Sequence, residues 1–70
     1  MMIQLIRLEE EITKNYAYVS EIYPDVEVLL VQVRSILDHG VNADVLSKWW
    51  QRNSDFIQRV QELLDNREHT

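Results

Sequence analysis

The chain has 70 residues and a formal net charge of −5, with no cysteine, one glycine and one proline. A chain of this length forms one domain and buries only about 60% of the surface that its unfolded form exposes, so a partner would add needed stability. The lack of cysteine excludes disulfides and thiolate metal sites, and the acidic balance disfavours binding to nucleic acid or to an anionic membrane.

Glycine and proline are too rare to supply the turns of a β-protein, and no Asn-Gly or Asp-Gly pair is present. We therefore expect an all-α fold, with one helical domain over residues 1–70. No apolar run approaches the ~20 residues that span a bilayer, and the first residues lack the features of a signal peptide. The sequence predicts a cytoplasmic protein with no membrane contact.

An amphipathic stripe predicts a first helix over about residues 3–22. Its apolar residues recur three or four positions apart, as Leu5, Leu8, Ile12, Tyr16, Val19 and Tyr23. At about 100° per residue, this spacing places them on one narrow face that a single neighbouring helix can cover.

Pro24 is expected to interrupt the helical pattern, because it lacks a backbone donor and disfavours the α conformation at Tyr23. The apolar spacing continues in phase beyond it, so the sequence leaves open whether Pro24 kinks one long helix or separates two packed helices. A second helix follows over about residues 25–39. Val28 and Val31 fall opposite its inward stripe, which suggests that another protein covers them.

The only glycine, Gly40, marks the turn of an antiparallel helical hairpin at residues 40–42. Glycine can take the left-handed conformation that ends a helix, and Asn42 can accept a backbone N–H at the start of the next helix. We expect that helix over about residues 43–66, followed by a disordered tail over residues 67–70.

The last helix carries an apolar arc of about 140°, wider than the coiled-coil-like seam that one antiparallel neighbour buries. One edge of the arc is Val45, Trp49, Phe56 and Leu63, and the other is Leu46, Trp50, Ile57 and Leu64. We expect the Trp49 edge to join the core and the Trp50 edge to face a partner. The expected partner-binding residues are Val28, Val31, Leu46, Trp50, Ile57 and Leu64.

No catalytic, cofactor or metal site is predicted. There is no cysteine nucleophile, no glycine-rich phosphate loop and no His/Asp/Glu set at metal-ligand spacing. His39 and His69 flank a helix about 35 Å long and cannot share a ligand within one chain. We therefore expect that the protein is not an enzyme.

The turn also resembles the core of a helix-turn-helix DNA-binding motif, with Gly40 in the turn and an apolar residue after it. Ile36, however, stands where that motif has alanine. Basic residues of the next helix follow one stripe that acidic residues interleave, which we interpret as solvated ion pairs. The basic residues are Lys48, Arg52 and Arg59, and the acidic ones are Asp55 and Glu62. A small DNA-binding regulator is therefore an alternative function.

The layout of the whole chain resembles the small E-type co-chaperones of the type III secretion needle subunit. The matching segments are an amphipathic stretch at residues 5–12, a helix end with a polar residue and a glycine at 33–41, and a long antiparallel helix at 46–64. The resemblance implies a hairpin that docks on a TPR-like partner, the pair keeping an aggregation-prone export substrate soluble in the bacterial cytoplasm.

The apolar arc and the outer valines by themselves predict a protein-binding helical adaptor. Its partner would be a helical-repeat chaperone in a hetero-complex or further copies in a homo-oligomer. A homodimeric regulatory or immunity-type helical protein uses the same features, so this alternative stays open.

Overall fold

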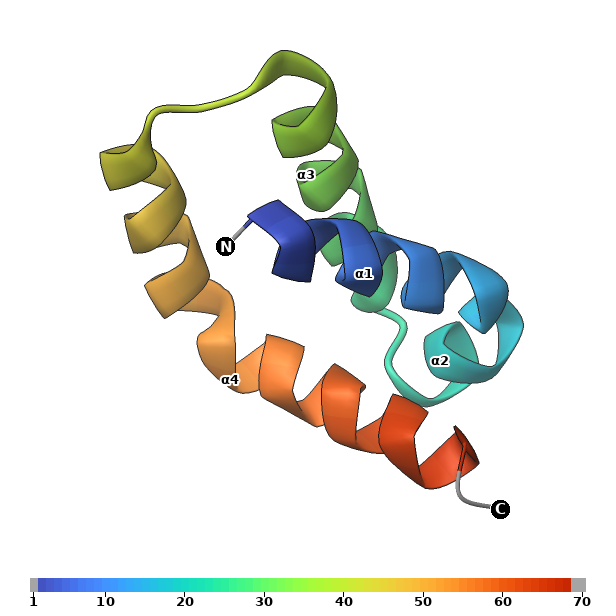
Figure 1. Ribbon diagram of the computed structural model, residues 1–70. Helices are drawn as coiled ribbons and strands as arrows, with labels where there is room; N and C mark the ends of the chain where they lie inside the picture. Colours follow the sequence, from blue (N-terminus) through green and yellow to red (C-terminus); the bar gives the residue numbers. More distant parts are fainter. Residues whose placement is uncertain (1, 69–70) are drawn as a thin grey trace.

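The computed structural model describes residues 2–68, which form the helices α1 (Met2–Lys14), α2 (Tyr16–Ile22), α3 (Val26–His39) and α4 (Ala43–Glu68). No strand occurs within this range, so the all-α class is confirmed. A helix of 26 residues such as α4 is about 39 Å long. The longest dimension of the molecule is 37 Å, and α4 bends near its middle (Figure 1).

Helices α3 and α4 run in roughly opposite directions and diverge from the turn that joins them (Figure 1). Helix α1 crosses the space between them, packing most extensively on α3 and also on α4. Helix α2 packs against both at the end distant from the turn. One side of the α3–α4 pair is thus covered by α1.

The expected single helix over residues 3–22 is wrong, because the chain leaves the helical conformation at Asn15. This residue has φ −115° and ψ 24°, and its side-chain Nδ2 donates to the backbone carbonyl of Glu11 at 2.9 Å. Asparagine side chains that bond the nearby backbone compete with helical hydrogen bonding. The break turns α2 back, so that Val19 is fully buried in the same core as Ile12 of α1.

Pro24 separates two packed helices. It lies in the turn between the end of α2 at Ile22 and the start of α3 at Val26, where the Val26 N–H donates to the Tyr23 carbonyl at 3.0 Å. The residue preceding a proline favours extended conformations, and Tyr23 has φ −123° and ψ 85°. The chain reverses here, and α3 begins one residue after the expected start.

The hairpin turn has the predicted cap. The Oδ1 atom of Asn42 accepts a hydrogen bond from the Val45 N–H at 2.9 Å, and the Gly40 N–H donates to the Ile36 carbonyl at 2.8 Å. Gly40 has the expected positive φ, 74°, but its ψ of 161° lies outside the left-handed helical region. This combination is essentially restricted to glycine, so the turn demands glycine more strictly than predicted.

Helix α4 extends to Glu68, beyond the expected end at residue 66. The guanidinium carbon of Arg67 lies 4.4 Å from the centre of the Tyr18 ring, a cation–π contact that ties the end of α4 to α2. The disordered tail expected over 67–70 is therefore wrong at residues 67 and 68. His69 and Thr70 lie outside the described residues.

All four helices contribute to one apolar core, and the Tyr23 and Phe56 rings meet edge-on at its border with a centroid distance of 5.8 Å. The buried apolar residues are Leu5, Leu8, Ile12, Val19, Val26, Leu29, Leu30, Val33, Ile36, Leu46, Ile57, Val60 and Leu64. The residues that α1 contributes to this core are Leu5, Leu8 and Ile12.

Candidate protein-binding surface

The structure reverses the expected roles of the two edges of α4. On the edge expected to face a partner, Ile57 is 1% exposed and Leu64 is 5% exposed, so both belong to the core. On the edge expected to be core, Val45 is 50% exposed and Phe56 is only partly buried. The reason is the position of α1, which approaches α4 on the Leu64 side.

The two tryptophans are both half-buried, and their rings lie edge to face with centroids 6.4 Å apart. Trp49 is also held by a hydrogen bond across the hairpin, since its Nε1 donates to Oε1 of Gln32 on α3 at 2.9 Å. Trp49 is held in place between α3 and α4, because its ring is partly buried and its indole N–H is hydrogen-bonded.

Two hollows lie between α3 and α4 and share Gln32 as a lining residue, and together we call them the α3–α4 groove. Its section nearer α2 has a volume of 420 Å³, and its section at the turn has 230 Å³. Gln32 lines both sections. The first is lined also by Asp25, Val28, Leu29, Asn53 and Phe56, and the second also by Ser35, Ile36, Val41, Val45, Leu46 and Trp49. These residues belong to α3, α4 and the positions that adjoin them.

The outer valines of α3 lie where the sequence placed them, with Val28 58% and Val31 61% exposed. Val28 forms part of the groove wall. Val31 lies one turn further on, in a stripe with Glu27, Arg34 and Asp38, because helical positions three, four and seven apart share a face.

Three cations follow the α4 side of the groove at a fixed spacing. Lys48, Arg52 and Arg59 each come three residues after an apolar groove residue, namely Val45, Trp49 and Phe56. Positions three apart are neighbours on a helix surface, so each cation stands beside an apolar groove residue. The carboxylates of Asp55 and Glu62 lie on the same stripe, so the α4 side of the groove carries charges of both signs.

The ion pairs expected along α4 do not form. The structure shows an ion pair between Arg34 Nε and Glu9 Oε1 at 3.5 Å, and it joins α3 to α1. Glu62 instead accepts a hydrogen bond from Gln58 at 3.3 Å. Among the described residues, no carboxylate lies within ion-pair distance of the three groove cations.

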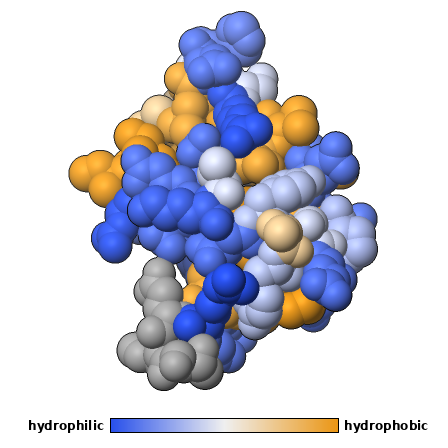
Figure 2. Space-filling model, turned by 90° about the vertical axis from the view of Figure 1, so that its right-hand side faces the viewer, coloured by the Kyte–Doolittle hydropathy of each residue, from blue (hydrophilic) through white to orange (hydrophobic). Residues whose placement is uncertain are grey.

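Apolar side chains also reach the surface elsewhere. Figure 2 views the molecule from the α2 end, where apolar groups gather in the upper half and hydrophilic groups cover the centre. On α1, Ile3 is 73% and Ile6 44% exposed. The described part of the chain does not enclose all of its apolar residues, as expected for a short chain.

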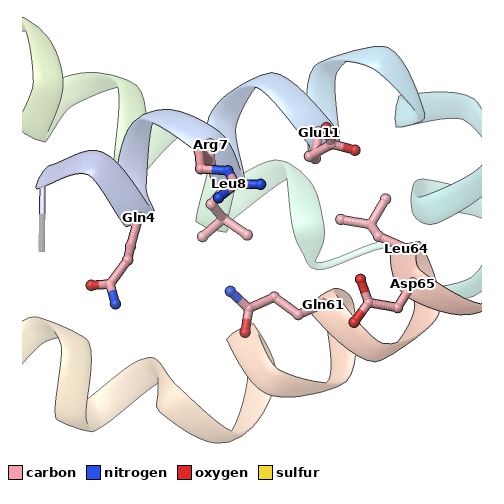
Figure 3. Close-up of a pocket in the computed structure, with 7 residues that line it drawn as sticks. All are labelled: Gln4, Arg7, Leu8, Glu11, Gln61, Leu64 and Asp65. Atoms are coloured by element: carbon pink, nitrogen blue, oxygen red, sulfur yellow. The ribbon is translucent and has the colours of Figure 1, made fainter. Parts of the chain in front are cut away.

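A second hollow of 290 Å³ lies where α1 meets α4 (Figure 3). Amide and charged side chains point into it from α1 and α4 around two leucines. Its lining is Gln4, Arg7, Leu8, Glu11, Gln61, Leu64 and Asp65. No group of three His, Cys, Asp or Glu side chains in residues 2–68 could hold a metal ion. We interpret this hollow as the polar seam between two packed helices.

Some of the predicted partner-binding residues thus reach the surface or line the groove, and others are buried. Val28, Val31 and the half-buried Trp50 reach the surface, Leu46 lies on the floor of the groove, and Ile57 and Leu64 do not reach solvent appreciably. The residues missed are Gln32, Val41, Val45, Trp49 and Phe56. The spacing of cations three residues after apolar positions was the signal that could have marked this edge.

Comparisons of the chain with models of protein families, with curated proteins and with solved structures found no match. In residues 2–68, no helix has the length and apolarity needed to cross a membrane.

Proposed function

We propose that this chain is a non-enzymatic, cytoplasmic helical adaptor that binds another protein through the α3–α4 groove. The observation that carries the proposal is an apolar surface on one side of the hairpin that α1 and α2 leave uncovered. Val28, Val41 and Val45 are 43–58% exposed there, beside the half-buried Trp49 and Phe56. Aromatic anchors surrounded by smaller apolar residues are typical of binding hot spots.

The test compares the native complexes of two variants. Val45→Glu places a charge in the groove, whereas Ile3→Glu makes the same change on the exposed face of α1. We expect native mass spectrometry of cell extracts to show the parent chain and the Ile3 variant in a stoichiometric protein complex. The Val45 variant should be free of that complex while its circular dichroism stays helical. A complex that both variants retain, or no complex at all, contradicts the proposal.

A more specific form of the proposal follows the resemblance to E-type co-chaperones. In that form the groove docks on a TPR-like helical-repeat partner, and the pair keeps an export substrate soluble. Coexpression with such a partner and a needle-type subunit should keep the subunit soluble, and Val45→Glu should abolish that effect. A needle subunit that aggregates equally with and without the chain contradicts this form only.

The DNA-binding alternative draws on the three groove cations, which have no ion-pair partner among the described residues. It predicts retention of duplex DNA that falls steeply with salt and is lost when Lys48 and Arg52 become alanine. We expect no retention in a gel-shift assay at low salt, since the chain carries a net charge of −5. A salt-sensitive shift that depends on these residues would replace the adaptor proposal.

A further inference from the structure

We infer that Asn15 is a hinge at which α1 and α2 can join into one straight helix, so that α1 packs on a second copy of the chain. Two chains then exchange their first helices and form a two-fold dimer. Three features support this exchange: the bonding at Asn15, the core that α1 and α2 share, and the fit of α1 to α3 and α4. The exchange takes place on the side of the α3–α4 pair that α1 covers, away from the groove of the proposed function.

The backbone around Asn15 keeps much of the bonding of an α-helix. The Asn15 N–H donates to the Glu11 carbonyl at 3.2 Å, and the Val19 N–H donates to the Asn15 carbonyl at 2.9 Å. Both bonds join positions four apart, as in an α-helix. Residues 2–22 include no glycine or proline, and their apolar residues keep helical spacing across the break. A straight helix over residues 2–22 is therefore compatible with the local sequence.

Asn53 of α4 shows that the side-chain bond of Asn15 does not by itself end a helix. In both residues Nδ2 donates to the backbone carbonyl four positions earlier, at 2.9 Å from Asn15 to Glu11 and at 2.8 Å from Asn53 to Trp49. Such a bond weakens or bends a helix. Helix α4 nevertheless continues through Asn53, whereas the helix is interrupted at Asn15. The packing of the neighbouring helices therefore decides whether the chain turns back at Asn15.

That packing is the core that α1 and α2 share. Ile12 of α1 and Val19 of α2 are both fully buried in it, and this requires the chain to turn back between them. A straight helix of residues 2–22 would be about 32 Å long and would direct α1 away from α2 and from their common core. Leu5, Leu8 and Ile12 would then be exposed, together with the surface of α3 and α4 that they cover. The straight form therefore needs another α1 in that place.

The α1 helix of a second copy meets this need, because it carries the same side chains. It would bury the same three apolar residues and repeat the polar contacts of Arg34 with Glu9 at 3.5 Å and with Thr13 at 3.1 Å. Exchange of an identical element conserves the contacts of the monomer, and it is therefore a low-cost route to a dimer. The proportion of dimer then depends on the chain concentration and on how readily residue 15 becomes helical.

The experiment compares Asn15→Ala with Asn15→Gly in the full chain. Alanine favours the helical conformation more than asparagine does, and glycine favours it less. Each dimer contains two straight hinges, so this preference counts twice. After refolding from urea, sedimentation equilibrium should give a dissociation constant at least about tenfold lower for the alanine variant than for the glycine variant, with the parent between them. Equal constants, or an alanine variant without a dimer, would overturn the exchange.

Asn15 is only partly buried and lies outside both helices, so both variants should fold, and circular dichroism checks this. If the glycine variant does not fold, the alanine variant should still dimerise about fivefold more tightly than the parent.

The identity of the exchanged helix is tested on the alanine variant by nuclear magnetic resonance. Isotope-labelled and unlabelled chains are refolded together, and an isotope-filtered nuclear Overhauser experiment detects contacts between different chains. We expect contacts of α1 side chains with α3 side chains between labelled and unlabelled copies. A dimer in which these contacts remain within one chain would contradict the exchange.

The matched control is Asn53→Ala, which removes the same kind of side-chain bond within α4. It should dimerise like the parent, and a decrease of its dissociation constant equal to that of Asn15→Ala would overturn the role of Asn15 as a hinge. Val45→Glu, in the groove, should also exchange α1 like the parent. Absence of exchange would leave a Val45-dependent complex in cell extracts standing, and loss of that complex would leave the exchange standing.

Discussion

The pair formed by helices α3 and α4 has two long sides that differ in solvent exposure. On one side, α1 lays its apolar stripe across the pair, and Val33, Ile57 and Val60 become fully or almost fully buried. On the other side, similar residues of the same two helices, such as Val31 and Val45, remain at least half exposed. The amphipathic pattern of a helix therefore gives its apolar positions, whereas the neighbouring helices decide which of them become core.

The largest expected effect is on the covered side. Ile57→Ala removes three buried carbon atoms from a side chain that is 1% exposed, and it should lower the free energy of unfolding by about 3 kcal/mol. Urea denaturation followed by circular dichroism measures the loss. If the alanine variant does not fold, Ile57→Val should still cost about 1 kcal/mol. A cost near zero for both would mean that α1 does not bury this edge of α4.

A matched pair of valines on α3 tests the comparison directly. Val33 is fully buried and Val31 is 61% exposed, so the same change to alanine should cost about 2 kcal/mol at Val33 and under about 0.5 kcal/mol at Val31. The measurement is urea denaturation at a protein concentration low enough to keep the chain monomeric. Equal losses would show that both sides of α3 are covered within one chain.

Gly40 lies in the turn between α3 and α4, and its replacement should have an intermediate effect on the free energy of unfolding. With φ 74° and ψ 161°, alanine or valine at this position should cost about 1 to 2 kcal/mol from backbone strain alone. No atom outside the adjoining residues lies within 4 Å of the position of an added Cβ, so steric crowding is not the cause. Thermal melts check this, and Gly40→D-Ala should melt close to the parent because a D-residue favours positive φ. Coincident melts for all three replacements would show that the turn takes another conformation in solution.

The smallest expected effect concerns the polar contact that joins α1 to α3 on the covered side. Arg34 bonds Oγ1 of Thr13 at 3.1 Å and pairs with Glu9 at 3.5 Å, but its side chain is 49% exposed. Exposed pairs contribute about 0.2 to 1 kcal/mol and weaken with salt. A double-mutant cycle of Arg34→Ala and Glu9→Gln should give a coupling in that range that falls at high salt. A much larger coupling would mean that this contact, more than apolar burial, holds α1 in place.

The sequence predicted the local features of this protein well, because they depend on neighbouring residues in the chain. The scarcity of glycine and proline predicted an all-α fold, Asn42 caps α4 as expected, and the spacing of Val28 and Val31 placed them outside the α3 core stripe. The break at Asn15 was missed, since asparagine lowers helix stability only moderately and the apolar stripe continues in phase through it.

The assignment of the two edges of α4 could not be obtained from the sequence. Val45, Trp49, Phe56 and Leu63 form as good an apolar edge as Leu46, Trp50, Ile57 and Leu64, and both are continuous along the same helix. The choice depends on where α1 crosses, which follows from the turn-back at Asn15 and from the direction in which α4 leaves Gly40. The crossing position of α1 is set by contacts between residues distant in sequence, and the free energies of these contacts sum over the whole core. The residues on each face of α4 were therefore determined by the sequence, and only the tertiary structure decided which face remained available to a partner.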